Sequence, residues 1–202
     1  QILGVVGNED CLFLNISAPK FTEPQTTPLP VIFYIHGGGY QMGTANYYHA
    51  NYLMDQDVIF VAPNYRLGVF GFLNTGDEVI RGNAGMKDQR LALKWVNENI
   101  EAFGGDPSRI TIIGESAGGG SIHHLMLSPS TKGLFAKAVC MSGVGTQTWG
   151  IESTSDAVKF TKKLAQRFNC TSDDSSQIAE CLRGKTVKQL LTEYRKEAGQ
   201  MI

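Results

Sequence analysis

The sequence predicts an α/β fold in which a central, mostly parallel β-sheet is covered on both faces by helices. Two observations support this prediction. Apolar runs of strand length alternate with longer segments whose apolar residues recur every three or four positions. The order strand, helix, strand also implies crossover connections, which join parallel strands. With 202 residues, of which 42% are hydrophobic, the chain can bury a substantial single core.

Five apolar runs have the length and composition of strands. They cover residues 12–16, 31–36, 58–63, 110–113 and 136–141. The last run contains Cys140, which we expect to be a buried free thiol because it lies inside an apolar run.

Four further segments have helical periodicity. The longest, from about 85 to 103, places Leu93, Val96 and Ile100 on one face. It is followed by Gly104-Gly105-Asp106-Pro107, which we interpret as a helix stop and turn. The other helices are expected at 117–127, 155–168 and 187–194, with a polar loop between the last two.

Residues 114–118 read Gly-Glu-Ser-Ala-Gly between a predicted strand and a predicted helix. This is the nucleophile-elbow pattern, Gly-x-Ser-x-Gly, in the context that it requires. A serine on so tight a turn has strained backbone angles, and side chains two positions to either side would collide, which explains the two glycines. We therefore predict that Ser116 is the nucleophile of a serine hydrolase.

A second glycine-rich segment, His-Gly-Gly-Gly-Tyr at 36–40, follows the second strand. Residues without a Cβ let main-chain N–H groups approach a ligand atom directly. We predict that the amides of Gly38, Gly39 and Ala117 form an oxyanion hole. The alternative, a dinucleotide-binding loop, is disfavoured because the spacing is not Gly-x-Gly-x-x-Gly and residues 41–44 do not begin a convincing helix.

A nucleophilic serine also needs a base and an acid that orients the base, in the chain order Ser, acid, His for this kind of elbow. His123 and His124 lie about 10 Å further along the same helix, too far to reach the Ser116 hydroxyl. His36 adjoins the glycines and is expected to shape that segment. We therefore expect the histidine base and the acidic residue beyond Ile202, so the rest of the same polypeptide is a required partner and this chain alone would be inactive.

Composition excludes several other classes. A formal net charge of -1 gives no basic surface for nucleic acid. No apolar run reaches the length of a membrane span. Neither His-Glu-x-x-His nor paired cysteines at ligand spacing occur, so no metal site is predicted, and the chemistry requires no cofactor.

The segment Glu-Asp-Cys-Leu-Phe-Leu-Asn-Ile at 9–16 resembles the second signature of type-B carboxylesterases, the cholinesterase-like branch of the α/β-hydrolases. The segments 36–40, 64–68, 83–90 and 103–107, the elbow and 141–143 resemble the same family in order. The resemblance covers nearly the whole chain and is strongest to insect carboxylesterases. It implies that residues 1–202 are a fragment of a single α/β-hydrolase domain that contains the nucleophile and the oxyanion hole.

The resemblance also implies roles for other residues. Tyr40 and Trp149 fall where the family places aromatic walls around the acyl group, and Glu115 is expected to border the substrate beside the nucleophile. Arg66 and Asp88 match a buried ion pair of the family.

Cysteines and sequons bear on the cellular compartment. Cys170 and Cys181 close a short polar loop, and they are either a disulfide in an oxidising compartment or two reduced thiols of a cytosolic protein; the resemblance implies the disulfide. The sequons Asn15-Ile16-Ser17 and Asn169-Cys170-Thr171 are weak additional support for secretion. We expect a secreted or secretory-pathway glycoprotein, with a cytoplasmic protein as the alternative.

These observations together predict a carboxylic-ester hydrolase that forms a serine acyl-enzyme with a small-molecule ester. The alternative is a non-catalytic adhesion or binding protein of the same family. It is disfavoured because such members often lose the serine or the oxyanion glycines, and both are intact here. A lipase or thioesterase would share the elbow but fits the other segments poorly.

Overall fold

The computed structural model describes residues 6–20 and 27–198, which belong to two compact units. We call Leu12–Tyr65 with Met86–Ile151 the sheet unit, and Gln1–Cys11, Arg66–Gly85 and Glu152–Ile202 the helical unit. No helix in the described ranges is both long enough and apolar enough to cross a lipid bilayer.

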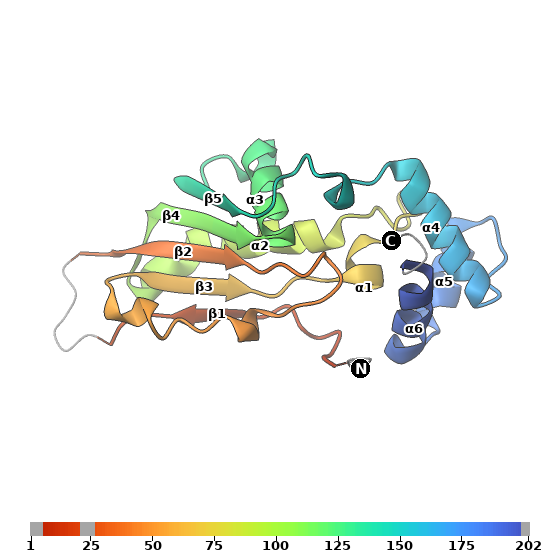
Figure 1. The fold of residues 1–202 in the computed structure, drawn as a ribbon, viewed down its shortest axis with the longest axis horizontal. Coiled ribbons are helices and arrows are strands. Elements are labelled where there is room, and N and C mark those ends of the chain that lie inside the picture. The colour runs from red at the N-terminus through yellow and green to blue at the C-terminus, as the bar shows by residue number, and fades with distance from the viewer. Residues whose placement is uncertain (1–5, 21–26, 199–202) are drawn as a thin grey trace. The chain divides into compact units, whose positions relative to one another are not determined.

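The sheet unit is built on five strands in the order β1-β3-β2-β4-β5 (Figure 1). They are β1 (Leu14–Ser17), β2 (Leu29–Ile35), β3 (Ile59–Pro63), β4 (Gly105–Glu115) and β5 (Lys137–Met141). β2 is parallel to both β3 and β4, β4 is parallel to β5, and only β1 runs antiparallel, to β3. The predicted α/β class with a mostly parallel sheet flanked by helices is therefore confirmed.

Burial along the strands follows their place in the sheet. Every residue of β3 is buried, as expected for a continuous apolar strand inside a mostly parallel sheet. β5 lies at the edge, and its residues are exposed or half-buried. The predicted burial of Cys140 is therefore wrong: its thiol is only half-buried, because no described strand covers the outer side of β5.

The sheet unit contains α3 and all but the first two residues of α2. α2 (Ala84–Asn99) ends in a 3-10 turn (Ile100–Phe103), and Leu93, Val96 and Ile100 are buried as their spacing predicts. Gly104, at φ 81°, ends this segment in the left-handed conformation that glycine tolerates. α3 (Ala117–Leu127) has the predicted bounds. Short 3-10 turns lie at Ala45–Tyr47, Leu53–Asp55, Pro129–Thr131 and Thr148–Gly150.

The predicted turn at 104–107 is wrong after its first residue, because β4 already begins at Gly105. Gly105 pairs with Leu29 and Ile110 pairs with Val31, with a register shift between the two pairs. The intervening residues therefore bulge out of the ladder, and the Asp-Pro turn sequence is accommodated inside a strand.

The helical unit contains α1 (Gly68–Phe72), α4 (Thr154–Arg167), α5 (Ser175–Arg183) and α6 (Val187–Ala198). α4 and α6 were predicted, but α5 replaces much of the predicted polar loop. The Asp174 side chain caps α5 by accepting the N–H of Ser176. Ile178, Ala179 and Leu182 bury one face of this helix. Its remaining residues are mostly polar, so the short apolar stripe was easily missed.

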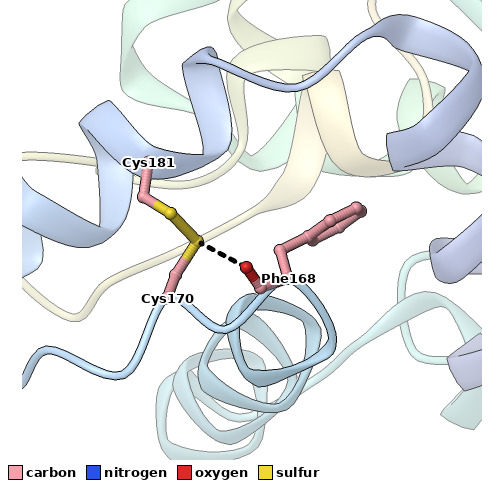
Figure 2. The surroundings of a disulfide bond; sticks show 3 residues. All are labelled: Phe168, Cys170 and Cys181. Carbon is pink, nitrogen blue, oxygen red and sulfur yellow. Dashed lines mark hydrogen bonds between the residues drawn. A yellow bond between two sulfur atoms is a disulfide. The ribbon is translucent and has the colours of Figure 1, made fainter.

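The disulfide predicted between Cys170 and Cys181 is confirmed, with the two Cα atoms 6.0 Å apart (Figure 2). Cys170 is buried in the apolar cluster of the helical unit, beside Leu164 and Leu182. Its Sγ lies 3.9 Å from the carbonyl oxygen of Phe168. Because a disulfide sulfur carries no hydrogen, this approach is a packing contact. The bridge joins the end of α4 to the last turns of α5.

Candidate active site

Ser116 stands alone between the end of β4 and the start of α3, with φ 55° and ψ -121°. Left-handed φ values are costly for a residue with a Cβ, so neighbouring contacts must hold this conformation. The Ser116 N–H donates to the Met141 carbonyl at 2.8 Å, and its own carbonyl accepts from the Gly120 N–H at 3.0 Å. The side chain is half-buried and therefore accessible.

The two glycines of the Gly-x-Ser-x-Gly pattern are required by close backbone contacts. A Cβ on Gly114 would lie 2.3 Å from the Gly118 carbonyl oxygen, and a Cβ on Gly118 would lie 2.1 Å from that of Ile35. Both distances are far below ordinary contact, so neither position admits a larger residue without movement of the backbone.

The glycine segment after β2 lies directly beside the serine. A Cβ on Gly37 would be 3.0 Å from Ser116 Cβ and 2.7 Å from the Glu115 carbonyl oxygen. This proximity follows from the parallel pairing of Ile35 with Gly114, which places the carboxyl ends of β2 and β4 at the same edge of the sheet.

The segment then turns sharply. Gly38 and Gly39 have φ values of 108° and 61°, and the Gly38 carbonyl accepts the N–H groups of Gln41 and Met42 at 3.0 and 3.1 Å. Among the described residues, no hydrogen bond is found from the main-chain N–H groups of Gly38, Gly39 or Ala117. These are the three donors that the sequence predicts for the oxyanion hole.

His36 is 1% exposed and contacts both the glycine segment and Tyr65. Its Nδ1 lies 2.8 Å from the Gly37 carbonyl oxygen, and Nδ1 must carry the proton because a carbonyl can only accept. Tyr65 stacks on the ring at 4.4 Å and donates its hydroxyl to the His36 carbonyl at 2.8 Å. Burial lowers the pKa of His36. His36 thus helps to hold the glycine segment, as its position in the sequence suggests.

Tyr65 is a partner of His36 that no local sequence pattern predicts. The only signal was its position in the segment 64–68, which matches the family. Neither the stacking on His36 nor the bond to the His36 carbonyl follows from a local pattern, because the two residues come from the ends of different strands.

Tyr40 lies over the first turns of α3. Its hydroxyl accepts from the Ser121 Oγ at 3.4 Å and would be 3.0 Å from a Cβ on Gly120. Burial raises the pKa of Tyr40. Glu115 also borders the site, since its Oε2 would be 2.9 Å from a Cβ on Gly37. Trp149 is 52% exposed, and no described contact joins it to Ser116.

The other residues singled out by the sequence lie elsewhere. Asp88 is buried on α2 in the sheet unit, whereas Arg66 is half-buried in the helical unit, and their ion pair stays a prediction. His123 lies on α3, where its Nδ1 accepts the N–H of Gly145 at 3.0 Å. Burial lowers the pKa of the adjacent His124, with a smaller contribution from His123.

The chain is similar to known proteins along most of its length. A model of the carboxylesterase family matches residues 2–201. The chain is 44% identical over 193 residues to Esterase E4 of Myzus persicae, and the match covers 94% of this chain and 35% of that protein. It is 45% identical over 184 residues to Venom carboxylesterase-6 of Apis mellifera, with 91% and 32% covered.

A less similar match is Neuroligin-2 of Mus musculus, whose name states no activity. It is 40% identical over 203 residues, covering 91% of this chain and 24% of that protein. The chain thus spans about a third or less of the length of these curated relatives.

Proposed function

The chain belongs to the carboxylesterase family, and on that premise we propose that it supplies the nucleophile and the oxyanion hole of a serine carboxylesterase. The observation that carries the proposal is the close approach of Gly37 to Ser116, where a Cβ on the glycine would lie 3.0 Å from the serine Cβ. It brings a strained, accessible serine beside the segment that holds the amides of Gly38 and Gly39. The names Esterase E4 and Venom carboxylesterase-6 support an ester as the substrate.

In the proposed reaction, Ser116 Oγ attacks the carbonyl carbon of the ester and passes its proton to a histidine base outside residues 1–202. The negative charge that develops on the carbonyl oxygen is stabilised by the N–H groups of Gly38, Gly39 and Ala117. The alcohol leaves with a proton, and water then hydrolyses the acyl-enzyme. Removing one oxyanion donor typically costs about 3–4 kcal/mol of transition-state stabilisation.

Neighbouring side chains shape the proposed site. The contact of Tyr40 with Ser121 on α3 supports its proposed role of bordering the acyl group, and the proximity of Glu115 to Gly37 supports a role for Glu115 on the side of the glycine segment. Trp149 is assigned to the acyl wall on the family resemblance alone.

The compartment is a separate proposal. We propose that the protein passes through the secretory pathway and is glycosylated at Asn169. The disulfide beside this residue is typical of oxidising compartments. Asn169 is exposed and has a φ of 57° at the end of α4. The Asn15 side chain is also exposed, but its amide donates to Asn46 at 2.9 Å.

The decisive experiment uses the full-length protein that carries this chain. We expect the wild type to hydrolyse a p-nitrophenyl ester and to be labelled covalently by a fluorophosphonate, and Ser116→Ala to lose both activities. Ser130→Ala is the matched control, because it removes the exposed hydroxyl of a serine outside the elbow. This variant should behave as the wild type.

Normal ester turnover by Ser116→Ala would contradict the proposed mechanism. A wild-type protein that neither turns over esters nor reacts with the probe, but binds another protein stoichiometrically, would support the non-catalytic alternative.

A further inference from the structure

The loop that follows β5 packs against the backbone of the proposed nucleophile. We call residues 142–145 the β5 loop. A Cβ on Gly143 would lie 1.9 Å from the Ser116 carbonyl oxygen. A Cβ on Gly119 would lie 2.8 Å from the carbonyl oxygens of both Gly143 and Met141. Met141, immediately before the loop, accepts the Ser116 N–H at 2.8 Å. The peptide groups on both sides of Ser116 therefore depend on where this loop lies.

The far end of the β5 loop is held by α3. The Gly145 N–H donates to His123 Nδ1 at 3.0 Å. A Cβ on Gly145 would lie 2.9 Å from His124 Cε1, so the loop backbone rests on a second imidazole. Both histidines lie on the helix that Ser116 begins. The loop is thus clamped at one end by the elbow and at the other by His123.

The hydrogen bond from Gly145 determines which ring nitrogen of His123 acts as the acceptor. Because Gly145 supplies the hydrogen, Nδ1 of His123 must present its lone pair, and any ring proton lies on Nε2. An amide oxygen can take the place of this nitrogen as an acceptor, whereas an aliphatic side chain cannot. Substitutions that keep or remove the acceptor at position 123 therefore separate the effect of the hydrogen bond from the effect of side-chain size.

We propose that His123 is a positioning residue for Ser116, an inference that rests on the proposed esterase function. Its Nδ1 anchors Gly145, the anchored loop presses Gly143 against the Ser116 carbonyl, and this contact helps to keep the serine at φ 55°. His123 touches neither the substrate nor the Ser116 hydroxyl in this scheme. Losing the anchor should slow chemistry while leaving substrate binding unchanged, because small displacements of reacting groups reduce rates steeply.

The test compares His123→Leu, His123→Asn and the control His49→Asn in the full-length protein. His49 is exposed and outside this network. The readouts are the fluorophosphonate labelling rate, kcat and KM for a p-nitrophenyl ester, and the thermal midpoint. We expect His123→Leu to lower the labelling rate and kcat about tenfold with KM unchanged. His123→Asn should restore most of both, because its Oδ1 can accept the Gly145 N–H.

Two results would overturn the inference. One is a His123→Leu protein that labels at the wild-type rate. The other is a folded His123→Asn protein whose labelling rate is one tenth of the wild-type rate or lower. This second result also decides the question if His123→Leu fails to fold. A wild type that does not react with the probe contradicts the proposed function itself, and the inference falls with it.

Discussion

Adding one methyl group at Gly143 tests how tightly the β5 loop is packed against Ser116. In Gly143→Ala the new Cβ would lie 1.9 Å from the Ser116 carbonyl oxygen, and that neighbour is backbone, which cannot rotate away. Atoms in protein interiors are close-packed, so the loop or the elbow must move by about 1 Å or more.

The expected loss of stability has two sources, overpacking and the weakening of two hydrogen bonds of Ser116. Overpacking a close-packed site typically costs about 1–3 kcal/mol. The Ser116 carbonyl also accepts the Gly120 N–H at 3.0 Å, and its N–H donates to Met141 at 2.8 Å. Each such bond contributes about 0.5–1.5 kcal/mol net. We therefore expect the free energy of unfolding to fall by about 2–6 kcal/mol. The labelling rate of Ser116 should fall by about 100-fold, because a displacement of about 1 Å misaligns the attack.

The assay measures the thermal midpoint and the fluorophosphonate labelling rate of the full-length protein. Gly150→Ala is the matched control, because nothing lies within 4 Å of a Cβ there and its φ is ordinary. This control should be neutral or stabilised by about 0.4–1 kcal/mol. A Gly143→Ala protein with wild-type midpoint and labelling rate would refute the packing argument, and with it the close contact between the loop and the elbow.

Two further predictions concern stability. Cys170→Ser should lower the free energy of unfolding by about 3 kcal/mol in non-reducing buffer, because the bridge to Cys181 closes a short loop; an unchanged thermal midpoint would count against a stabilising disulfide. Burial lowers the pKa of His36, so between pH 6.5 and that lower value the unfolded chain binds a proton that the folded one does not. Stability is therefore complete above pH 6.5 and declines as the pH falls below it, by at most about 1.4 kcal/mol per pH unit. A His36→Gln variant should lose this component in denaturant titrations across pH 5–8, and an identical slope in both proteins would show that His36 does not contribute.

Much of the sheet and of the site could be predicted because their signals are local. The apolar runs located each of the five strands found in the described part of the chain, with bounds that shifted by a few residues, apart from the earlier start of β4. α3 has the predicted bounds because the elbow pattern marks its first residue and a polar stop marks its last. The position of Ser116 on a strained turn follows from the same pattern.

The predictions that failed concern features that depend on contacts with distant segments. α5 was missed because only three of its residues, Ile178, Ala179 and Leu182, are buried. The burial of Cys140 was overestimated because an apolar run does not say whether its strand lies inside a sheet or at its edge. The Asp-Pro sequence after Gly104 was read as a turn because the bulge that admits it depends on pairing with β2.

By itself, the sequence determined where most of the strands and helices lie and which residues are candidates for the proposed ester hydrolysis. Periodicity, turn residues and glycines act within a few positions of one another, so they can be read along the chain. Only the tertiary structure decided that Tyr65 stacks on His36, that Gly37 meets Ser116 and that His123 holds the β5 loop. Those contacts join segments distant in sequence, and strand order and register set their distances.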